Sequence, residues 1–424
     1  MVHRITQVDL LQVLDSRGDP TVKAFVSLAD GRGAATAPAG ASAGSHEAAF
    51  LRDGGTAFAG RSVEGIINTR LAPLRQALTG VDAGDPVAVE HALSDLDATF
   101  PASGTTPWPG LGGNIAMAVS VASWLAVAQA TRTEPWQLMA QWCGAQPTLP
   151  MPMVNIISGG AHAARAIDIQ DILALPFGAK SVEEAIHDAW CTRAATREVL
   201  DQLGHPTALV ADEGGLAAAF ESSTSAIAAV HRAIVELSAT AKIGIALDVA
   251  ATEFQVSAGR YRIAGNELSG QELVAQIQQW IGDFGVISIE DPLGEDDDWA
   301  CARSLVSSAQ VIGDDRFVTN AARLRLGIEA GEANAILIKP NQAGSLLRTT
   351  QALALAKQQS WGTVVSARSG ETEESWLVDL AVGTGAGQIK VGSTMRSERT
   401  AKWNRLLELS SQTNLPFAGW SRPT

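Results

Sequence analysis

Cysteine is scarce in this sequence, with three residues among 424. Cys143, Cys191 and Cys301 lie far apart, without paired spacing and without the spacing of metal ligands. Disulfide frameworks and cysteine-based metal sites depend on such spacing. The scarcity argues against both, and it predicts a reduced, cytoplasmic setting.

Basic residues are also in short supply, since 31 Lys and Arg face 45 Asp and Glu, and the formal net charge is −14. Binding to nucleic acid or to an acidic membrane surface depends on clustered positive charge. We therefore expect neither as a partner. A local basic pocket can still bind a small anion.

Long hydrophobic runs are missing too. The most apolar segment, residues 115–128, contains Ser120 and Ser123 and falls short of the roughly 20 residues that a membrane span needs. Near the N-terminus, Asp9 interrupts the chain before the apolar stretch of a secretory signal develops. These features predict a buried helix at residues 115–128 and no export signal.

The chain divides near residue 140 into two parts with different patterns. In the first part, residues 20–38 alternate between apolar and polar positions and turn at Asp30-Gly31, which predicts a β-hairpin. Helical patterns follow through residues 62–130. We predict a small N-terminal α+β domain at residues 1–138 and a larger domain at residues 139–424.

Short apolar runs that end on or beside a charged residue, each followed by a helical pattern, repeat through the larger part. This alternation indicates a parallel sheet covered by helices, and the number of repeats favours closure into a (β/α)8-type barrel. The predicted strands are residues 208–213, 243–248, 286–290, 310–314, 335–339, 363–367 and 388–390. Because the carboxyl ends of barrel strands open on one mouth, their terminal residues should meet there.

Three carboxylates, Asp248, Glu290 and Asp314, end successive strands of this set. Carboxylates crowded together repel one another unless a hard divalent cation lies between them, and magnesium is the natural candidate. Any one of the three can instead cap the helix after its strand. For all three together, we favour a magnesium site.

Two lysines, Lys339 and Lys390, end later strands of the same set. A lysine beside a metal ion and a second lysine has a lowered pKa and can act as a base at neutral pH. The pattern predicts removal of a proton next to a carboxylate, with a metal ion stabilising the enolate. On this reasoning either lysine can be the base.

Taken together, the motifs of the chain resemble those of the enolase family, from LDSRGDPTV at residue 14 to RSERTAKWNRLL at residue 396. They occur in the order and at the spacing of the family. The matching motifs are PAGASAG, GGNIAMAVSVA, NIISGGAHA, ADEGG, LDVAATEF, SIEDP, GDDRFVTN, LIKPNQAGS, SARSGETEES and GQIKVGSTMRSER. The resemblance implies an enolase-type barrel, two magnesium sites and a homodimer formed through the small domain and the DSRGDP segment.

The resemblance also implies a role for each matching residue. Asp248, Glu290 and Asp314 would hold the first magnesium ion, and Ser42 would help to hold the second. Lys339 would take the proton from C2 of the substrate, and Lys390 would neutralise the substrate carboxylate. The remaining matches are Arg368 and Ser369 for the substrate phosphate, Glu213 for the leaving hydroxyl at C3, and His162 and Gln170 for the lining of the same pocket.

Several positions depart from the family pattern. Ala367 stands where enolases have histidine, and Asp171, which we count among the catalytic candidates, stands where they have glutamate. The shorter side chain withdraws the carboxylate by about an ångström, a shift that can cost on the order of a hundredfold in rate. Ala39 replaces a serine, and Arg165 and Arg316 replace small, polar or apolar residues.

We interpret these departures as the mark of a divergent enolase-family enzyme that depends on magnesium. Its substrate would be a small phosphorylated or phosphonylated acid of the phosphoglycerate or enolpyruvate type, bound in part where Ala367 leaves space. Such an enzyme would be similar to carboxyphosphonoenolpyruvate synthase of phosphonate antibiotic biosynthesis. The alternatives are an enolase that converts 2-phosphoglycerate to phosphoenolpyruvate, and a non-catalytic enolase-like scaffold.

Overall fold

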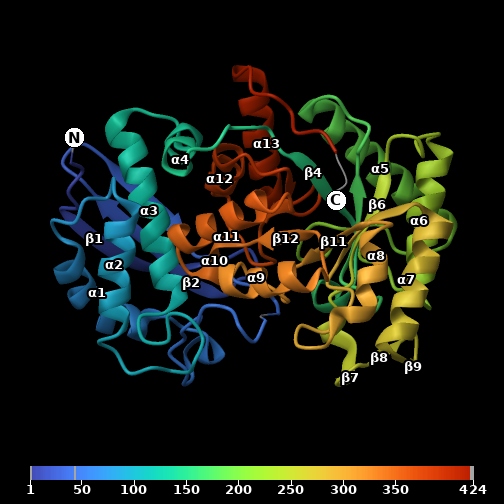
Figure 1. Ribbon diagram of the computed structural model, residues 1–424, viewed down its shortest axis with the longest axis horizontal. Helices are drawn as coiled ribbons and strands as arrows, with labels where there is room; N and C mark the ends of the chain where they lie inside the picture. The colour runs from blue at the N-terminus through green and yellow to red at the C-terminus, as the bar shows by residue number, and fades with distance from the viewer. Residues whose placement is uncertain (1, 43, 421–424) are drawn as a thin grey trace.

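The small domain is built on a three-stranded antiparallel sheet of β1 (Gln7–Leu14), β2 (Pro20–Ser27) and β3 (Arg32–Thr36). The computed structural model describes residues 2–42 and 44–420, and Figure 1 shows this domain beside the barrel. β2 and β3 form the predicted hairpin. The helices are α1 (Glu64–Leu78), α2 (Pro86–Asp97) and α3 (Gly113–Thr131), with a 3-10 turn at Ala57–Gly60.

α3 is the core helix of the small domain, and it packs against β2 and β3. The contact is close, since a Cβ atom at Gly33 would overlap the backbone carbonyl of Ala122. Among the described residues, α3 is the one helix long and apolar enough to span a membrane by length and composition, yet 78% of its most apolar window is buried. The predicted buried helix at residues 115–128 is confirmed.

α4 (Pro135–Cys143) connects the two parts and packs against α12 (Trp376–Thr384) of the barrel. The predicted boundary after residue 138 falls inside this helix and stays a prediction.

Eight strands close into a barrel in the order β10-β11-β12-β13-β14-β4-β5-β6. Most are buried on both faces, which explains their continuous apolar sequences. The strands are β4 (Met151–Ser158), β5 (Asp171–Leu175), β6 (Gly244–Asp248), β10 (Val286–Glu290), β11 (Gln310–Gly313), β12 (Ala335–Ile338), β13 (Gly362–Ser366) and β14 (Gln388–Lys390). The predicted barrel with a smaller N-terminal α+β domain is confirmed.

Helices surround the barrel, and a small sheet follows β6. The helices are α5 (Val182–Gln202), α6 (Ser223–Glu236), α7 (Gly270–Phe284), α8 (Arg303–Val306), α9 (Ala321–Ala330), α10 (Pro340–Ala343), α11 (Leu346–Gln358) and α13 (Ser397–Gln412). The small sheet contains β7 (Gln255–Ser257), β8 (Arg260–Ile263) and β9 (Asn266–Ser269). Further 3-10 turns lie at Gly160–Ala163, Ala251–Phe254 and Trp299–Ala302.

Two expectations about the sheet were wrong. β5 runs antiparallel to both neighbours, so the barrel is not wholly parallel and the first residue of β5, Asp171, lies at the mouth. Residues 208–213 form no barrel strand. Glu213 lies instead in a turn between Val210 and Leu216, which form an isolated bridge.

The loop after β3 carries the small domain to the barrel mouth. Ala39 and Gly370 exchange backbone hydrogen bonds of 3.0 and 2.8 Å, and the amide of Ala41 donates to Ser369 Oγ at 2.5 Å. Both partners lie in the loop after β13. Ser42 is therefore brought to the mouth although it belongs to the other domain.

Candidate active site

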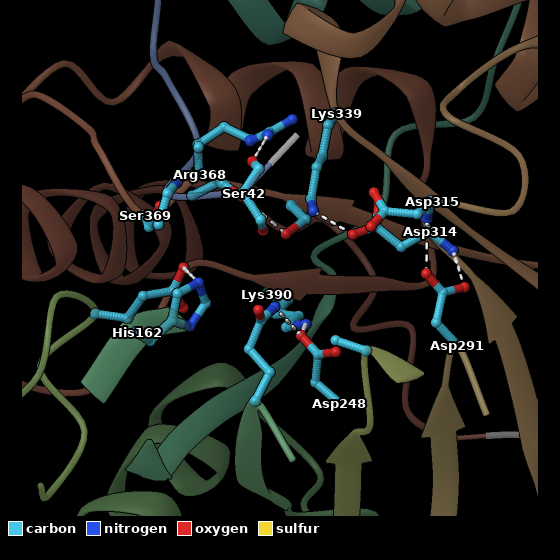
Figure 2. Close-up of a pocket in the computed structure, with 17 residues that line it drawn as sticks. Ser42, His162, Asp248, Asp291, Asp314, Asp315, Lys339, Arg368, Ser369 and Lys390 are labelled. Carbon is cyan, nitrogen blue, oxygen red and sulfur yellow. Dashed lines mark hydrogen bonds and ion pairs between the residues drawn. The ribbon is translucent and has the colours of Figure 1, made fainter. Parts of the chain in front are cut away.

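One pocket at the barrel mouth brings together most of the residues that the sequence predicts, as Figure 2 shows. They are Ser42, His162, Gln170, Glu213, Asp248, Asp314, Lys339, Ala367, Arg368, Ser369 and Lys390. Among the described residues, the predicted Glu290 and Asp171 do not line it. Both are buried directly behind lining residues, which they contact.

Arg368 and Ser369 form a buried pair on the side of the small domain. Arg368 donates through Nη1 to Glu47 at 2.8 Å and through Nη2 to the carbonyl of Ser42 at 2.8 Å. Burial lowers the pKa of this guanidinium, but Glu47 and Asp314 outweigh burial and raise it. The arginine therefore stays charged, and its fork geometry suits a phosphate or carboxylate.

The chain requires a glycine at position 40, beside this arginine. A Cβ atom at position 40 would overlap both Arg368 Nη2 and the carbonyl of Ser42. The requirement is steric, and it keeps the loop of the small domain against the guanidinium.

Lys390 lies between two of the predicted metal ligands. Its Nζ donates to Asp248 Oδ2 and to Glu290 Oε2, each at 2.7 Å, and Asp248 Oδ2 also accepts from Gln170 Nε2 at 3.0 Å. Burial and the charge of Asp248 raise the pKa of Glu290 well above its usual range. The pKa of Lys390 is also raised, because the two carboxylates outweigh its burial.

Lys339 is paired with the third predicted ligand, Asp314, through a short contact to Oδ2. Burial lowers the pKa of Lys339, but Asp314 outweighs burial and raises it. Without a metal ion the nearest charge to Lys339 is a carboxylate, so its pKa is not lowered. The lowered pKa expected beside a bound metal ion stays a prediction.

Asp314 also belongs to an acidic cluster with Asp291 and Asp315, whose carboxylate oxygens lie within 4.8 Å of one another. Asp291 accepts from the amides of Asp314 and Asp315 at 2.9 and 2.7 Å. Burial and Asp314 raise the pKa of Asp291 to about 8. Three carboxylates that repel one another when ionised thus lie within a small volume.

The donor set fits a hard divalent cation. Glu290 Oε1 is buried and has no hydrogen-bond partner among the residues that the structure describes. An unpaired buried carboxylate oxygen costs free energy, and oxygen ligands are those that Mg²⁺ prefers. Asp291, Asp314 and Asp315 bring their carboxylate oxygens close enough together to hold such an ion. The predicted ligand set of Asp248, Glu290 and Asp314 stays a prediction. The magnesium role of Ser42 stays a prediction.

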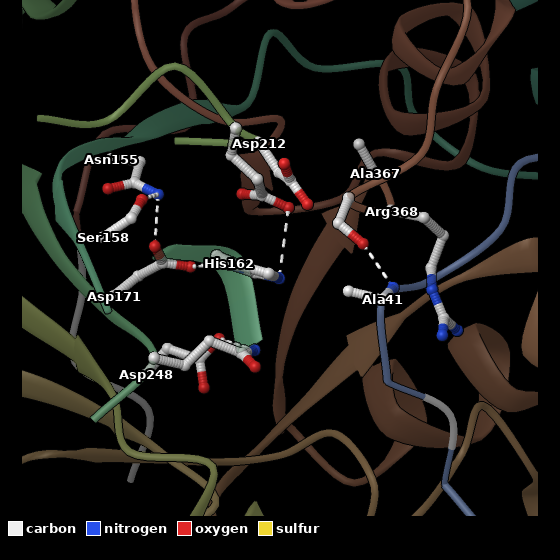
Figure 3. A network of polar contacts seen from close by, with 12 residues as sticks. Ala41, Asn155, Ser158, His162, Asp171, Asp212, Asp248, Ala367 and Arg368 are labelled. Carbon is white, nitrogen blue, oxygen red and sulfur yellow. Dashed lines mark hydrogen bonds and ion pairs between the residues drawn. The ribbon is translucent and has the colours of Figure 1, made fainter. Parts of the chain in front are cut away.

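His162 contacts two further acids at the pocket, and Figure 3 shows one of them, Asp171, beside it. Its Nδ1 lies 2.9 Å from Asp171 Oδ2 and its Nε2 lies 4.0 Å from Glu213 Oε1. Asp171 is fully buried, and its other oxygen accepts from Asn155 Nδ2. Both oxygens of Asp171 are thus engaged away from the cavity, so it acts on the pocket through His162.

The charge of His162 depends on these acids. Burial lowers its pKa, but Asp171 and Glu213 outweigh burial and raise it to about 9. Because the folded-state pKa lies above the ordinary 6.5, the stability that this charge contributes is complete below about pH 6.5 and is lost as the pH rises through about 9.

We expect Asp171→Asn to lower the pKa of His162, because the largest opposing charge is removed while burial remains. The imidazole signals in an NMR titration of the magnesium-free protein measure this pKa. Asp168→Asn is the control, since that carboxylate accepts from the amide of Ala264 instead. A His162 pKa that is the same in the Asp171 variant and in the wild type would contradict the assignment.

The two arginines singled out by the sequence lie elsewhere. Arg316 donates to Glu332 at 2.8 and 2.9 Å and to the carbonyls of Glu295 and Asp297. Arg165 is largely exposed, with its guanidinium 3.9 Å from Glu253. Neither lines the pocket among the described residues. In the described part of the chain, neither arginine therefore borders the pocket that Ala367 lines.

Sequence reasoning missed three acids of the site, namely Glu47, Asp291 and Asp315. Each stands in a quoted motif or beside one: Asp291 in SIEDP, Asp315 in GDDRFVTN, and Glu47 just after PAGASAG. The doubled acids were a usable signal. The sequence around Glu47 carries no comparable signal, because this residue is buried by contact with Arg368 of the other domain.

The fold and the site together define a barrel protein whose mouth holds buried carboxylates, two buried lysines and an anion-binding arginine. Residues 5–139 match the family model described as enolase, N-terminal domain, and residues 146–420 match enolase, C-terminal TIM barrel domain. The chain belongs to the enolase family. This membership supports an enzyme of the enolase superfamily.

Proposed function

We propose that the protein is a magnesium-dependent enzyme that removes the C2 proton of a phosphoglycerate- or enolpyruvate-type acid to give an enolate. The observation that carries the proposal is that one pocket holds two buried lysines, the buried acids and the Arg368–Ser369 pair. Small anionic acids need such convergent charge to leave water.

Each residue has a definite task in this proposal. Arg368 and Ser369 bind the phosphate or phosphonate, and Lys390 faces the substrate carboxylate. Lys339 takes the C2 proton on Nζ, which requires its neutral form. A divalent cation on Asp248, Glu290 and Asp314 supplies positive charge next to the substrate carboxylate when it is bound.

The later step is where we propose divergence from enolases. Asp171 is turned away from the cavity toward Asn155 and His162, and Ala367 presents no polar group to it. Departure of a C3 hydroxyl therefore has fewer groups to assist it. A group-transferring reaction of the kind performed by carboxyphosphonoenolpyruvate synthase is our finer proposal, and it rests on these two positions.

Dehydration of 2-phosphoglycerate is the second candidate, because Glu213 and His162 remain in the pocket. A non-catalytic scaffold is less well supported, since buried charges such as Lys390 and Glu290 cost stability that a scaffold has no reason to lose. Exchange of the C2 proton of 2-phosphoglycerate in deuterated water, with and without Mg²⁺, tests the proposal. Absence of magnesium-dependent exchange would leave the scaffold as the better account.

The double variant Ala367→His with Asp171→Glu is expected to raise formation of phosphoenolpyruvate from 2-phosphoglycerate by on the order of a hundredfold. The glutamate extends the carboxylate by one methylene, and the histidine supplies a polar group to the pocket. Each single change should do less, since residues that act as a unit are non-additive. Asp168→Glu is the control for the added methylene.

The wild-type rate must be measured first. A turnover of about ten per second, typical of enzymes, would favour the dehydrating enolase over the divergent enzyme. If the wild type is slow and the double variant no faster, the divergence lies at other positions.

We also propose a homodimer formed through the small domain. β1 ends at the DSRGDP segment and leaves Leu11 and Leu14 about half exposed, at 52% and 55%. Exposed apolar side chains such as these are stabilised when another surface covers them. We propose that a second copy of the chain supplies that surface.

A further inference from the structure

A second cavity of about 170 Å³ lies against the same arginine as the main pocket. Gly40 and Arg368 line both cavities, so they form the wall between them. The second cavity is also lined by Ala39, Glu47, Arg52, Asn114 and Asn341. We call it the Arg52 cavity.

The Arg52 cavity holds more hydrogen-bonding capacity than its own residues use. Asn114 is 3% exposed, and its Oδ1 has no partner among the described residues; the buried Oδ1 of Asn341 has none either. Unpartnered buried polar atoms are rare in folded proteins and call for a ligand or water. The Asn114 amide is fixed, because its Nδ2 donates to the carbonyl of Leu51 at 3.1 Å. The Asn341 amide can instead turn its nitrogen toward a ligand by rotation of the side chain.

Arg52 is the second guanidinium of this cavity. In the described part of the chain it donates through Nη1 alone, to the carbonyls of Pro20 at 3.1 Å and Arg61 at 2.6 Å. It lies over the ring of Phe50, 4.7 Å from its centroid. The Nε and Nη2 groups of Arg52 are therefore open to a further acceptor.

The charges of the lining favour an anion. Arg52 and Arg368 contribute two positive charges, and Glu47, already paired with Arg368, contributes one negative charge. Burial lowers the pKa of Arg52, a penalty that a bound anion would offset. At position 39 an alanine leaves open space on the wall formed by the loop of the small domain.

We propose that the Arg52 cavity binds a carboxylate group, so that Arg368 separates two anion sites. A carboxylate matches a guanidinium in shape and accepts two parallel hydrogen bonds, while a rotated asparagine amide can donate a third. The carboxylate belongs either to an arm of the ligand in the main pocket or to a separate small acid. The first source rests on the proposed function, and the second does not.

Matched probes separate the two sources. Phosphonoacetate carries a carboxylate beyond its phosphorus group, and ethylphosphonate has a methyl group in its place. If the carboxylate is an arm, the wild type should bind phosphonoacetate about tenfold more tightly by calorimetry, as expected for one added charged hydrogen bond. If it belongs to a separate acid, sodium acetate alone should bind.

Two variants test whether the cavity is responsible. Arg52→Gln removes the charge, and Ala39→Leu fills the space while Arg52 remains. Either should abolish the preference for phosphonoacetate or the binding of acetate. Arg61→Gln is the control, because that neighbouring arginine is paired with Asp19 and does not line the cavity. If Arg52→Gln fails to fold, Ala39→Leu still tests whether the Arg52 cavity binds the carboxylate.

Unchanged affinity for phosphonoacetate and acetate in both variants would overturn the inference. The proton-exchange assay on the wild type tests the main pocket separately. Loss of acetate binding in the variants, without exchange in the wild type, would refute the proposed function and keep the carboxylate site. Exchange with affinities insensitive to both variants would refute the carboxylate site alone.

Discussion

Replacing Lys339 by methionine is expected to slow magnesium-dependent exchange of the C2 proton by about a thousandfold, within the range that general base catalysis contributes. The ammonium group contacts Asp314 inside the pocket, and no other lysine contacts this carboxylate among the described residues. Methionine keeps the length of the stem but removes the proton acceptor. Affinity for 2-phosphoglycerate should change much less, because a base acts mainly in the transition state.

The exchange rate is followed by NMR in deuterated water, and binding by the ligand-induced rise in melting temperature. Lys357→Met is the matched control, since this lysine on α11 bonds the carbonyls of Thr384 and Gly385, away from the mouth. Exchange near the wild-type rate in Lys339→Met would assign the base elsewhere, and Lys390 would be the next candidate.

The second large effect is expected for Asp248→Asn, which should abolish the stabilisation that Mg²⁺ and 2-phosphoglycerate give together. With ligand at about a hundredfold its Kd, the wild type should gain about 2.7 kcal/mol. The asparagine amide would offer one neutral oxygen where Asp248 offers a charged carboxylate, so the affinity for a hard cation falls. Of the two carboxylates that pair with Lys390 in the described part of the chain, Glu290 would then remain charged.

Thermal unfolding with and without both ligands measures this gain. Asp283→Asn on the exposed side of α7 changes the net charge equally and should leave the gain intact. An undiminished gain in Asp248→Asn would contradict the ligand assignment. The unliganded variant must be compared with the unliganded wild type, because breaking a buried ion pair itself costs about 3–5 kcal/mol.

The strand ends were predictable because parallel strands buried on both faces leave an unbroken apolar run that stops at a charged residue. β6, β10 and β14 end at Asp248, Glu290 and Lys390, as the sequence indicated. The direction of β5 was not predictable, since DILAL is buried at every position and carries no pattern that distinguishes parallel from antiparallel pairing.

Residues 208–213 misled the prediction for a different reason. Four apolar residues followed by two acids resemble a strand end, yet Leu209 is 59% exposed. Among the described residues the segment takes part in one isolated bridge, between Val210 and Leu216. The position of the Arg316 side chain could not be predicted from the sequence either. It follows two acids of the site in sequence, but Glu332 holds its guanidinium elsewhere, and sequence distance says nothing about side-chain direction.

Gly40 and Arg368 place a joint limit on how this chain can change. A side chain at position 40 would occupy the volume of the guanidinium, so position 40 cannot gain one while Arg368 stays in place. Gain of a side chain at position 40 requires a shorter residue at position 368 and also a shift of the Ser42 carbonyl. The shorter residue in turn gives up the fork that binds an anion. Two positions more than three hundred residues apart in sequence are therefore linked by one steric constraint.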